Sequence, residues 1–495
     1  MRGIQAAAAS AAIVVLGGGS AAAQVVPDVG ARATLNVGGP AVCTSILEFV
    51  TTACQVSAYG VRLYGTIDVG GGYQTNGAPL DRSAQTGLTY FPQKMNNGGK
   101  FQVSPNALGA SNVGVQINEP LARGWSFVAQ LETSFDPATV FLADGPGSLR
   151  DAVGVPLGQA RGVSDSSVDG SFYNSLGFFG IGSDTFGTLT LLRQGSLMRD
   201  ATIAYDPIPS YAFSLVGATG PVSGGGDTEN VRATTALKYR VNVGDWRFAV
   251  FGQFGGYDLG NSAKGTFQGD VGADFHVGPG VVSADVIAGH TRDAIAEALS
   301  GYKVDPATGL GIAGSPAAGV TATISDNTNV MAVAKYATDR VTLYAGWEWM
   351  QFANPSDPVS AFTDISGFAF PVTGVTSISN TGFPRDKILQ VAWTGARYDI
   401  TRTLSVAAAY YHYWQNDFSN AGTIAGTKVT CADVSTALSS CAGAQDAGSI
   451  LLDWQFAPKW DTYIGTMYTR LNGGIDSGFL ARDNWATTAG LRLRW

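Results

Sequence analysis

Charged residues are scarce in this chain of 495 residues, since Lys, Arg, Asp and Glu together make up only 14% of it. The formal net charge is -8, and no basic stripe is present that would neutralise phosphates, which excludes a general nucleic-acid binder. Beyond residue 24 the sequence also lacks any run of about 20 apolar residues. A helical membrane protein is therefore excluded, and a chain that crosses a membrane by other means has to be a β-barrel.

Histidines are equally few, and the patterns of catalytic and metal sites are missing. His276, His290 and His412 are scattered, without an HExxH motif or a nearby cysteine or serine arrangement. The segment 309–314 matches the G-x-G-x-x-G string, but Pro306 and Pro316 bracket it in a predicted loop without a strand-to-helix context. We therefore predict that the chain is not an enzyme and has no catalytic residue, cofactor or metal site.

The first residues have the pattern of an export signal. Met1 and Arg2 precede a short apolar core, and small residues end the stretch at Ala21 to Ala23. The core is too short to span a bilayer as a helix, so we expect a signal peptide over residues 1–23.

Four cysteines form two close pairs in the sequence, Cys43 with Cys54 and Cys431 with Cys441. In an exported protein this spacing favours two local disulfides, although four cysteines allow three connectivities and free thiols remain an alternative.

What the sequence has in abundance is glycine, with 65 residues, and segments of alternating polarity. From position 61 to 69, for example, Val61, Leu63 and Ile67 alternate with polar side chains such as Arg62 and Asp68. On a strand this pattern puts apolar groups on one face, which is typical of transmembrane barrels but also of soluble sandwiches and solenoids.

The connections between these segments separate the two alternatives. Sixteen strands are predicted, and tight turns alternate with mostly long loops along the chain. Long loops at one end and tight turns at the other are what an even-stranded outer-membrane barrel requires. The predicted fold class is thus an all-β transmembrane antiparallel barrel, with strands at 59–74, 110–118, 124–135, 171–182, 185–193, 228–240, 243–256, 265–277, 280–292, 327–336, 341–353, 385–398, 401–414, 447–456, 460–471 and 484–495.

The same segments resemble a known family, the Gram-negative general porins. The opening strand from Val61 to Asp68 resembles their first strand, and Ser111 to Gly114 followed by Glu119 to Leu121 resembles their second hairpin. The stretch from Gly177 to Ile181 resembles the strands that lead to their constriction loop, and the last strand ends in Trp495 as theirs end in an aromatic residue. The resemblance covers most of residues 59–240 and the carboxyl terminus, and it implies a sixteen-stranded barrel that assembles as a homotrimer.

The resemblance also implies a pore constriction, in which an inward-folded third loop carries acidic groups that face basic groups on the wall. Here that loop is 194–227, with Arg199 beside the candidate acidic edge of Asp200 and Asp206. The usual basic ladder is largely absent: Thr66, Asn112 and Ser175 stand at three of its positions, and only Lys238 keeps its charge. Arg232 and Arg240 are expected on the same strand face as Lys238.

The loss of this basic ladder predicts a weak ion preference. Charged side chains of both signs are also predicted to face the lumen, where they would set any charge preference. They are Arg62, Arg247, Lys335, Arg492 and Arg494 against Asp68, Glu132, Asp270, Asp274, Asp285, Glu348 and Asp453.

We therefore expect an outer-membrane channel for passive diffusion of small hydrophilic solutes and ions, with outer-membrane lipid and the barrel assembly machinery as partners and no nucleic acid. The alternatives are a substrate-specific channel or barrel-embedded enzyme, and an adhesive or structural surface barrel. Residues 24–58 form an extension of unassigned role before the barrel of residues 59–495.

Overall fold

A single β-sheet dominates the computed structural model. The structure describes residues 42–77, 90–92, 98–122, 124–135, 137, 175–210, 212–216, 232–256, 259, 261, 263–300, 319–358, 375–418, 423–424, 427–428, 440–477 and 479–495. The predicted signal peptide, the string at 309–314 and Cys431 lie outside these residues. No helix among the described residues is long and apolar enough to cross a membrane.

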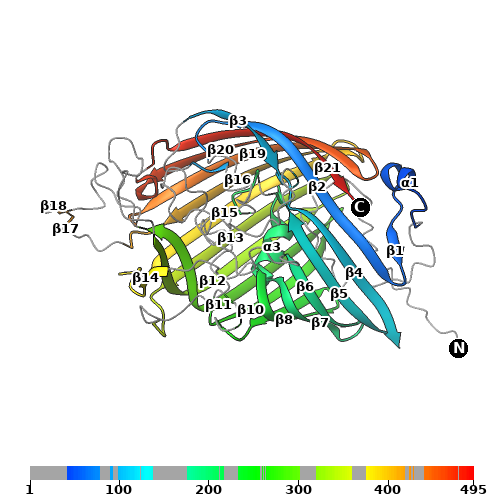
Figure 1. The fold of residues 1–495 in the computed structure, drawn as a ribbon, viewed down its shortest axis with the longest axis horizontal. Coiled ribbons are helices and arrows are strands. Elements are labelled where there is room, and N and C mark those ends of the chain that lie inside the picture. The colour runs from blue at the N-terminus through cyan, green and yellow to red at the C-terminus, as the bar shows by residue number, and fades with distance from the viewer. Residues whose placement is uncertain are drawn as a thin grey trace.

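Sixteen strands of the sheet close into an antiparallel barrel (Figure 1). Each strand pairs with the next in the chain, and the last pairs with the first through Thr66↔Arg494 to Gln74↔Ala486. The predicted fold class is thereby confirmed. The barrel strands are β2 (Val61–Gln74), β4 (Ser111–Ala122), β5 (Trp125–Phe135), β6 (Leu176–Ser183), β7 (Gly187–Gly195), β8 (Arg232–Val243), β9 (Trp246–Gln253), β10 (Gly265–Val277), β11 (Gly280–Ser300), β12 (Gly319–Ala337), β13 (Val341–Ala353), β15 (Lys387–Asp399), β16 (Leu404–Gln415), β19 (Gly443–Ala457), β20 (Trp460–Gly473) and β21 (Asp483–Arg494).

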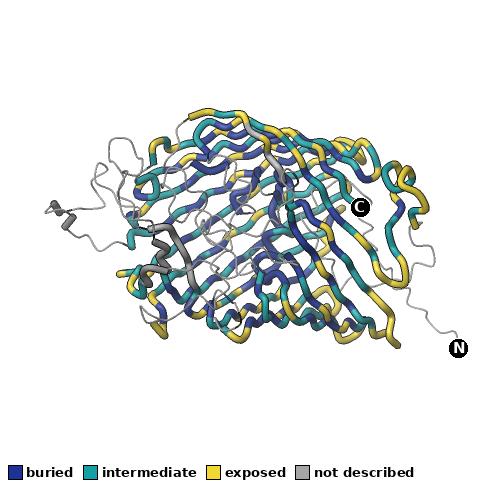
Figure 2. The backbone as a smooth tube through the Cα atoms, in the orientation of Figure 1, coloured by how far each residue is buried: buried dark blue, intermediate teal, exposed yellow. Residues whose placement is uncertain are grey.

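Alternation along these strands divides the side chains between two faces (Figure 2). On β19, Ile450, Leu452 and Trp454 are exposed on the outside, whereas Leu451 and Asp453 between them are buried on the inside. Because a strand directs successive side chains to opposite faces, the outer surface becomes an apolar band while the lumen receives most of the charged groups.

Three further strands of the sheet were not predicted from the sequence. β3 (Lys100–Pro105) and β4 pair with different parts of β2 along the same edge. Residues 106–110 separate β3 from β4 and form an interruption in this part of the wall. β14 (Val375–Ser379) pairs in parallel with the start of β12. β1 (Val56–Ala58) pairs with Val61 to Leu63 of β2. A separate two-stranded sheet joins β17 (Thr423–Ile424) to β18 (Thr427–Lys428).

The hairpin of β11 and β12 is also longer than predicted. A register shift between Thr291 and Ala294 marks a bulge, and pairing then continues to Ser300↔Gly319. The bulge interrupts the regular alternation at Asp293, where φ is 49°, and this interruption made the sequence look like a loop.

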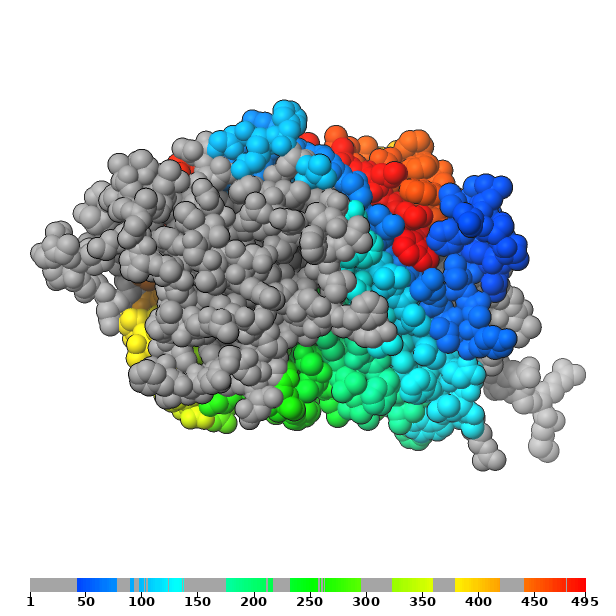
Figure 3. Space-filling model, viewed as in Figure 1, coloured from blue at the N-terminus to red at the C-terminus, as the bar shows by residue number. Residues whose placement is uncertain are grey.

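The segment before the barrel carries a disulfide and a short helix. Cys43 and Cys54 are bonded, with their Cα atoms 5.0 Å apart, and α1 (Ile46–Thr51) lies between them. Cys441 is also disulfide-bonded. Figures 1 and 3 show this segment at the tight-turn end of the barrel, beside the carboxyl terminus.

The division into an apolar outer band and a charged lumen is testable at Ile450, which lies in the middle of β19 and is 55% exposed. An Ile450→Arg substitution should lower the free energy of unfolding in lipid by roughly 2 to 4 kcal/mol, because a charge at the bilayer midplane is poorly solvated. Equilibrium unfolding from vesicles measures this effect, with Ile450→Leu as the control. Equal stabilities of the two variants would show that this face does not meet lipid.

Candidate pore constriction

The third loop enters the barrel directly after β7. It begins with α3 (Leu197–Tyr205), which lies inside the ring of strands (Figure 1). Ser196 caps the helix by accepting a hydrogen bond from the Arg199 amide, at 3.2 Å. The side-chain oxygen of Gln268 on β10 accepts a second bond from the Leu197 amide, at 2.7 Å. The barrel wall thus holds the first turn of the helix.

Asp200 anchors the same helix to β8 through two ion pairs. Its carboxylate lies 2.6 Å from the Lys238 ammonium and 2.5 Å from the Arg240 guanidinium. Arg199 is a more distant third cation, at 3.9 Å. Burial alone would raise the pKa of Asp200, but the three cations outweigh it and hold that pKa below its ordinary value. The charge of Asp200 is therefore compensated by the adjacent wall.

Asp206 is the C-cap residue of α3 and is almost fully buried. Its carboxylate accepts hydrogen bonds from the Tyr411 hydroxyl at 2.6 Å, the Ile208 amide at 3.1 Å and the Ser214 hydroxyl. Burial raises the pKa of this carboxyl group to about 7, although the three hydrogen bonds oppose the shift. Asp206 thus fixes the turn that follows α3.

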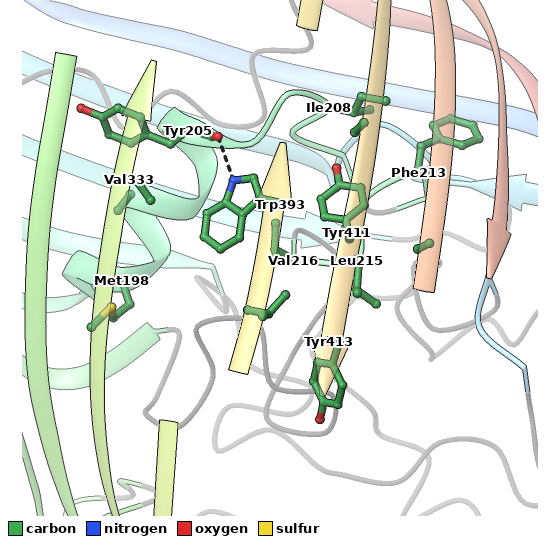
Figure 4. Packing of buried hydrophobic residues seen from close by; sticks show 14 of the residues in the cluster. Met198, Tyr205, Ile208, Phe213, Leu215, Val216, Val333, Trp393, Tyr411 and Tyr413 are labelled. Atoms are coloured by element: carbon green, nitrogen blue, oxygen red, sulfur yellow. Dashed lines mark hydrogen bonds between the residues drawn. The ribbon is translucent and has the colours of Figure 1, made fainter. Parts of the chain in front are cut away.

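Apolar packing holds the described residues after α3, as far as Val216, against the wall (Figure 4). The Trp393 indole donates to the Tyr205 carbonyl at 3.1 Å, and the Phe213 ring lies against Gly465, where an added Cβ would come within 2.7 Å of it. Further along, the Ala212 amide donates to the Ala107 carbonyl at 2.9 Å, in the interruption between β3 and β4. The described part of the loop is thus attached to the wall at several points.

Sequence reasoning missed this apolar wall. Strands β13, β15 and β16 direct Met350, Val391, Trp393 and Tyr411 inward, and all four are buried. The signal was available, because both alternating sets of side chains on β15 and β16 are largely apolar. A wall strand that faces only water would keep one polar set.

The three positions without basic residues lie in a different part of the wall. The Ser175 hydroxyl donates to Glu132 at 2.5 Å, and the Asn112 side chain donates to the Ala110 carbonyl at 3.0 Å. Thr66 pairs with Asn112 and Arg494 in the sheet. Within the described residues, no hydrogen bond or ion pair links these three positions to Asp200 or Asp206.

Arg232 differs from the sequence expectation. Gln194 pairs with Ala233 and Leu192 with Ala236, so β8 has one extra residue at this point. Because of this bulge, the positions of Ala233 and Ala236 are both buried, and the alternation is reversed on the two sides of it. Arg232 is therefore out of phase with Lys238 and Arg240, and the expectation of one shared face is wrong.

Two other charge clusters lie on the lumen wall, and each combines both signs. Arg247 contacts Asp274 at 2.5 Å and Asp285 at 3.0 Å. On the other side, the fully buried Arg492 contacts Asp461 at 2.9 Å. Among the described residues, no group of three or more His, Cys, Asp or Glu is arranged to hold a metal ion.

Comparison with known proteins relates this geometry to solved structures. No protein-family model matches the chain, and no curated protein matches its sequence. The anion-selective porin from Comamonas acidovorans superimposes with a TM-score of 0.51 at 12% identity, over 88% of this chain and 99% of the porin. OmpT, an outer membrane protein of Vibrio cholerae, gives a TM-score of 0.50 at 10% identity, over 89% and 99%.

The chain has the porin fold. The superposition covers nearly all of the two solved barrels, so the sixteen-strand ring is an architecture that they share with this chain. Because the sequence identity is low, the chemistry of the lumen has to be derived from the residues of this chain.

Asp200 offers a test of the charge compensation at β8. Asp200→Asn leaves Lys238 and Arg240 without their anion, and a unit charge contributes ~1 kcal/mol at 4 Å in water. We expect a severalfold rise in the chloride-to-potassium permeability ratio, measured as a reversal potential in a salt gradient. Asp184→Asn, in the turn between β6 and β7, is the matched control. An unchanged reversal potential in Asp200→Asn would place this cluster away from the ion path.

Asp206 predicts a pH dependence of stability. Its pKa rises from 3.8 to about 7 in the folded protein, so its contribution is fully present below 3.8 and is lost as the pH rises through about 7. The unfolding free energy in detergent should therefore fall between pH 4 and pH 8 by a few kcal/mol more in the wild type than in Asp206→Asn. Parallel pH profiles of the two proteins would contradict this assignment.

Proposed function

We propose that this chain forms a water-filled channel in the outer membrane of a Gram-negative bacterium, through which small hydrophilic solutes and ions diffuse passively. The observation that carries the proposal is the closed sixteen-strand ring with an apolar outside and charged groups inside. A ring of this size is wide enough to leave an aqueous path beside an inward loop.

The pore constriction is proposed to lie where α3 approaches the wall of β8. Asp200, Lys238 and Arg240 meet there, and Arg199 and Asp206 belong to the same loop. Thr66, Asn112 and Ser175 would contribute uncharged groups to the remaining wall. Since Asp200 is compensated locally and the other clusters combine both signs, the pore should have only a weak ion preference.

A substrate-specific channel is the second candidate, and the lumen aromatics are the feature that bears on it. Trp393 and Tyr411 face inward but are covered by the third loop, where they bond to Tyr205 and Asp206. Tyr64 donates instead to Glu132 at 2.9 Å. The buried Trp393 and Tyr411 therefore do not supply an open stacking surface for a solute, which favours the general channel.

We also propose that residues 1–23 are an export signal, on the pattern of their sequence. Insertion by the barrel assembly machinery and assembly as a homotrimer are proposed because the resemblance to general porins implies them. Native mass in detergent would distinguish a trimer from a monomer.

Planar bilayers test the channel directly. Purified, folded protein should produce stepwise conductance that grows in proportion to salt concentration, with a reversal potential near zero in a potassium chloride gradient. Each step reports one water-filled path, so silent membranes with correctly folded protein would overturn the proposal. A large reversal potential of either sign would contradict the weak preference alone.

A further inference from the structure

The helix before the barrel lies on its outer surface, as two tryptophans of the barrel show. Trp495 belongs to the outward set of β21, and its backbone exchanges hydrogen bonds with Gly65 at 3.2 and 3.0 Å. Its ring covers the outward side of Gly65, where an added Cβ would lie 2.2 Å from the ring. Gly65 alternates in phase with Leu63 and Val69, which are exposed on the outer band. Trp495 therefore marks the outer surface at the tight-turn end.

α1 packs against this outer surface. The Phe49 ring meets Trp495 edge to face, with centroids 6.0 Å apart. The indole of Trp460, at the start of β20, donates to the Val50 carbonyl at 3.1 Å. Lys459 donates to the Phe49 carbonyl at 2.7 Å and lies 4.1 Å from the centre of its ring. The barrel thus supplies hydrogen bonds to two carbonyls at the end of the helix and partly covers one of its faces.

The ends of this segment are tied down as well. The disulfide joins Cys43 to Cys54, and the Cys43 amide donates to the Gln55 carbonyl at 2.9 Å. β1 then joins the sheet beside β2. The helix is consequently held in one position on the barrel rather than on a free tail (Figure 3).

The opposite side of α1 is apolar and open. Ile46 is 84% exposed and Leu47 is 73% exposed. Glu48 lies between Leu47 and Phe49 in the sequence, but its carboxylate is directed back to the start of the helix. There it accepts hydrogen bonds from the Thr44 amide and hydroxyl at 2.8 and 2.7 Å. Two large apolar side chains thus project from a helix whose other apolar residues already contact the barrel.

We infer that α1 is an interfacial anchor, which inserts Ile46 and Leu47 into the lipid leaflet at the tight-turn end of the barrel. Lipid is the expected partner because α1 continues the apolar outer surface of the barrel: Phe49 contacts Trp495 on the same surface that carries Leu63 and Val69. Aromatic residues at barrel ends mark the membrane interface, and short amphipathic helices bind there with their apolar side in the acyl boundary. This inference rests on the proposed membrane location.

A single-cysteine label measures the contact. Leu47→Cys adds one free thiol while the native disulfides stay intact, and the thiol is coupled to an environment-sensitive nitrobenzoxadiazole dye. The full-length protein is reconstituted in phosphatidylcholine vesicles, with or without lipid brominated along the acyl chain. We expect the brominated lipid to quench the dye at least half as strongly as it quenches a dye at Ile450→Cys, the lipid-facing reference on β19. Asp245→Cys, in the turn between β8 and β9 at the same end, is the control that should stay unquenched.

The three labels separate the possible outcomes. A dye at position 47 that resists brominated lipid but is quenched by aqueous iodide would overturn the inference, because α1 would then face water. Energy transfer between labelled copies without lipid quenching would overturn it in favour of a second copy of the chain. Failure at Ile450→Cys as well would place the whole barrel outside the membrane and would count against the proposed function instead.

Discussion

Backbone hydrogen bonding at the seam between the first and last strands is the constraint on which the rest of the structure depends. In lipid, an unpaired strand edge leaves amides and carbonyls without partners, so the sheet has to close. β21 pairs only with Thr66 to Gln74 of β2, and Trp495, which follows β21, exchanges backbone hydrogen bonds with Gly65. β1 then takes over the pairing from Val61 to Leu63. The residues before the barrel therefore complete an edge that the sixteen strands alone leave open.

The lumen is divided between two kinds of wall. Strands β13, β15 and β16 offer apolar side chains that the third loop covers, whereas β8 offers Lys238 and Arg240 to Asp200. The third loop is thus held by apolar packing on one side of the lumen and by the ion pairs of Asp200 on another.

Strict alternation made the barrel predictable, and two departures from alternation produced errors. All sixteen wall strands were found from the sequence, since an outer apolar band and a polar lumen leave a period of two. The bulges near Asp293 and Leu192 shifted that period, which hid the end of β11 and put Arg232 in the wrong phase. The location of α1 depends on contacts with Trp460 and Trp495, more than 400 residues away, which a local pattern does not contain.

The interruption between β3 and β4 also determines how the third loop can behave. Ala107, in this interruption, accepts a hydrogen bond from Ala212 of the loop, while Gln268 on the wall strand β10 accepts one from Leu197 at the start of α3. The described segment from Leu197 to Ala212 is therefore attached to the wall at both of its ends and is not free to swing as a hinged lid would be. The space beside this segment then depends on the shape of the wall that holds it, so the segment and the ring of strands have to move together.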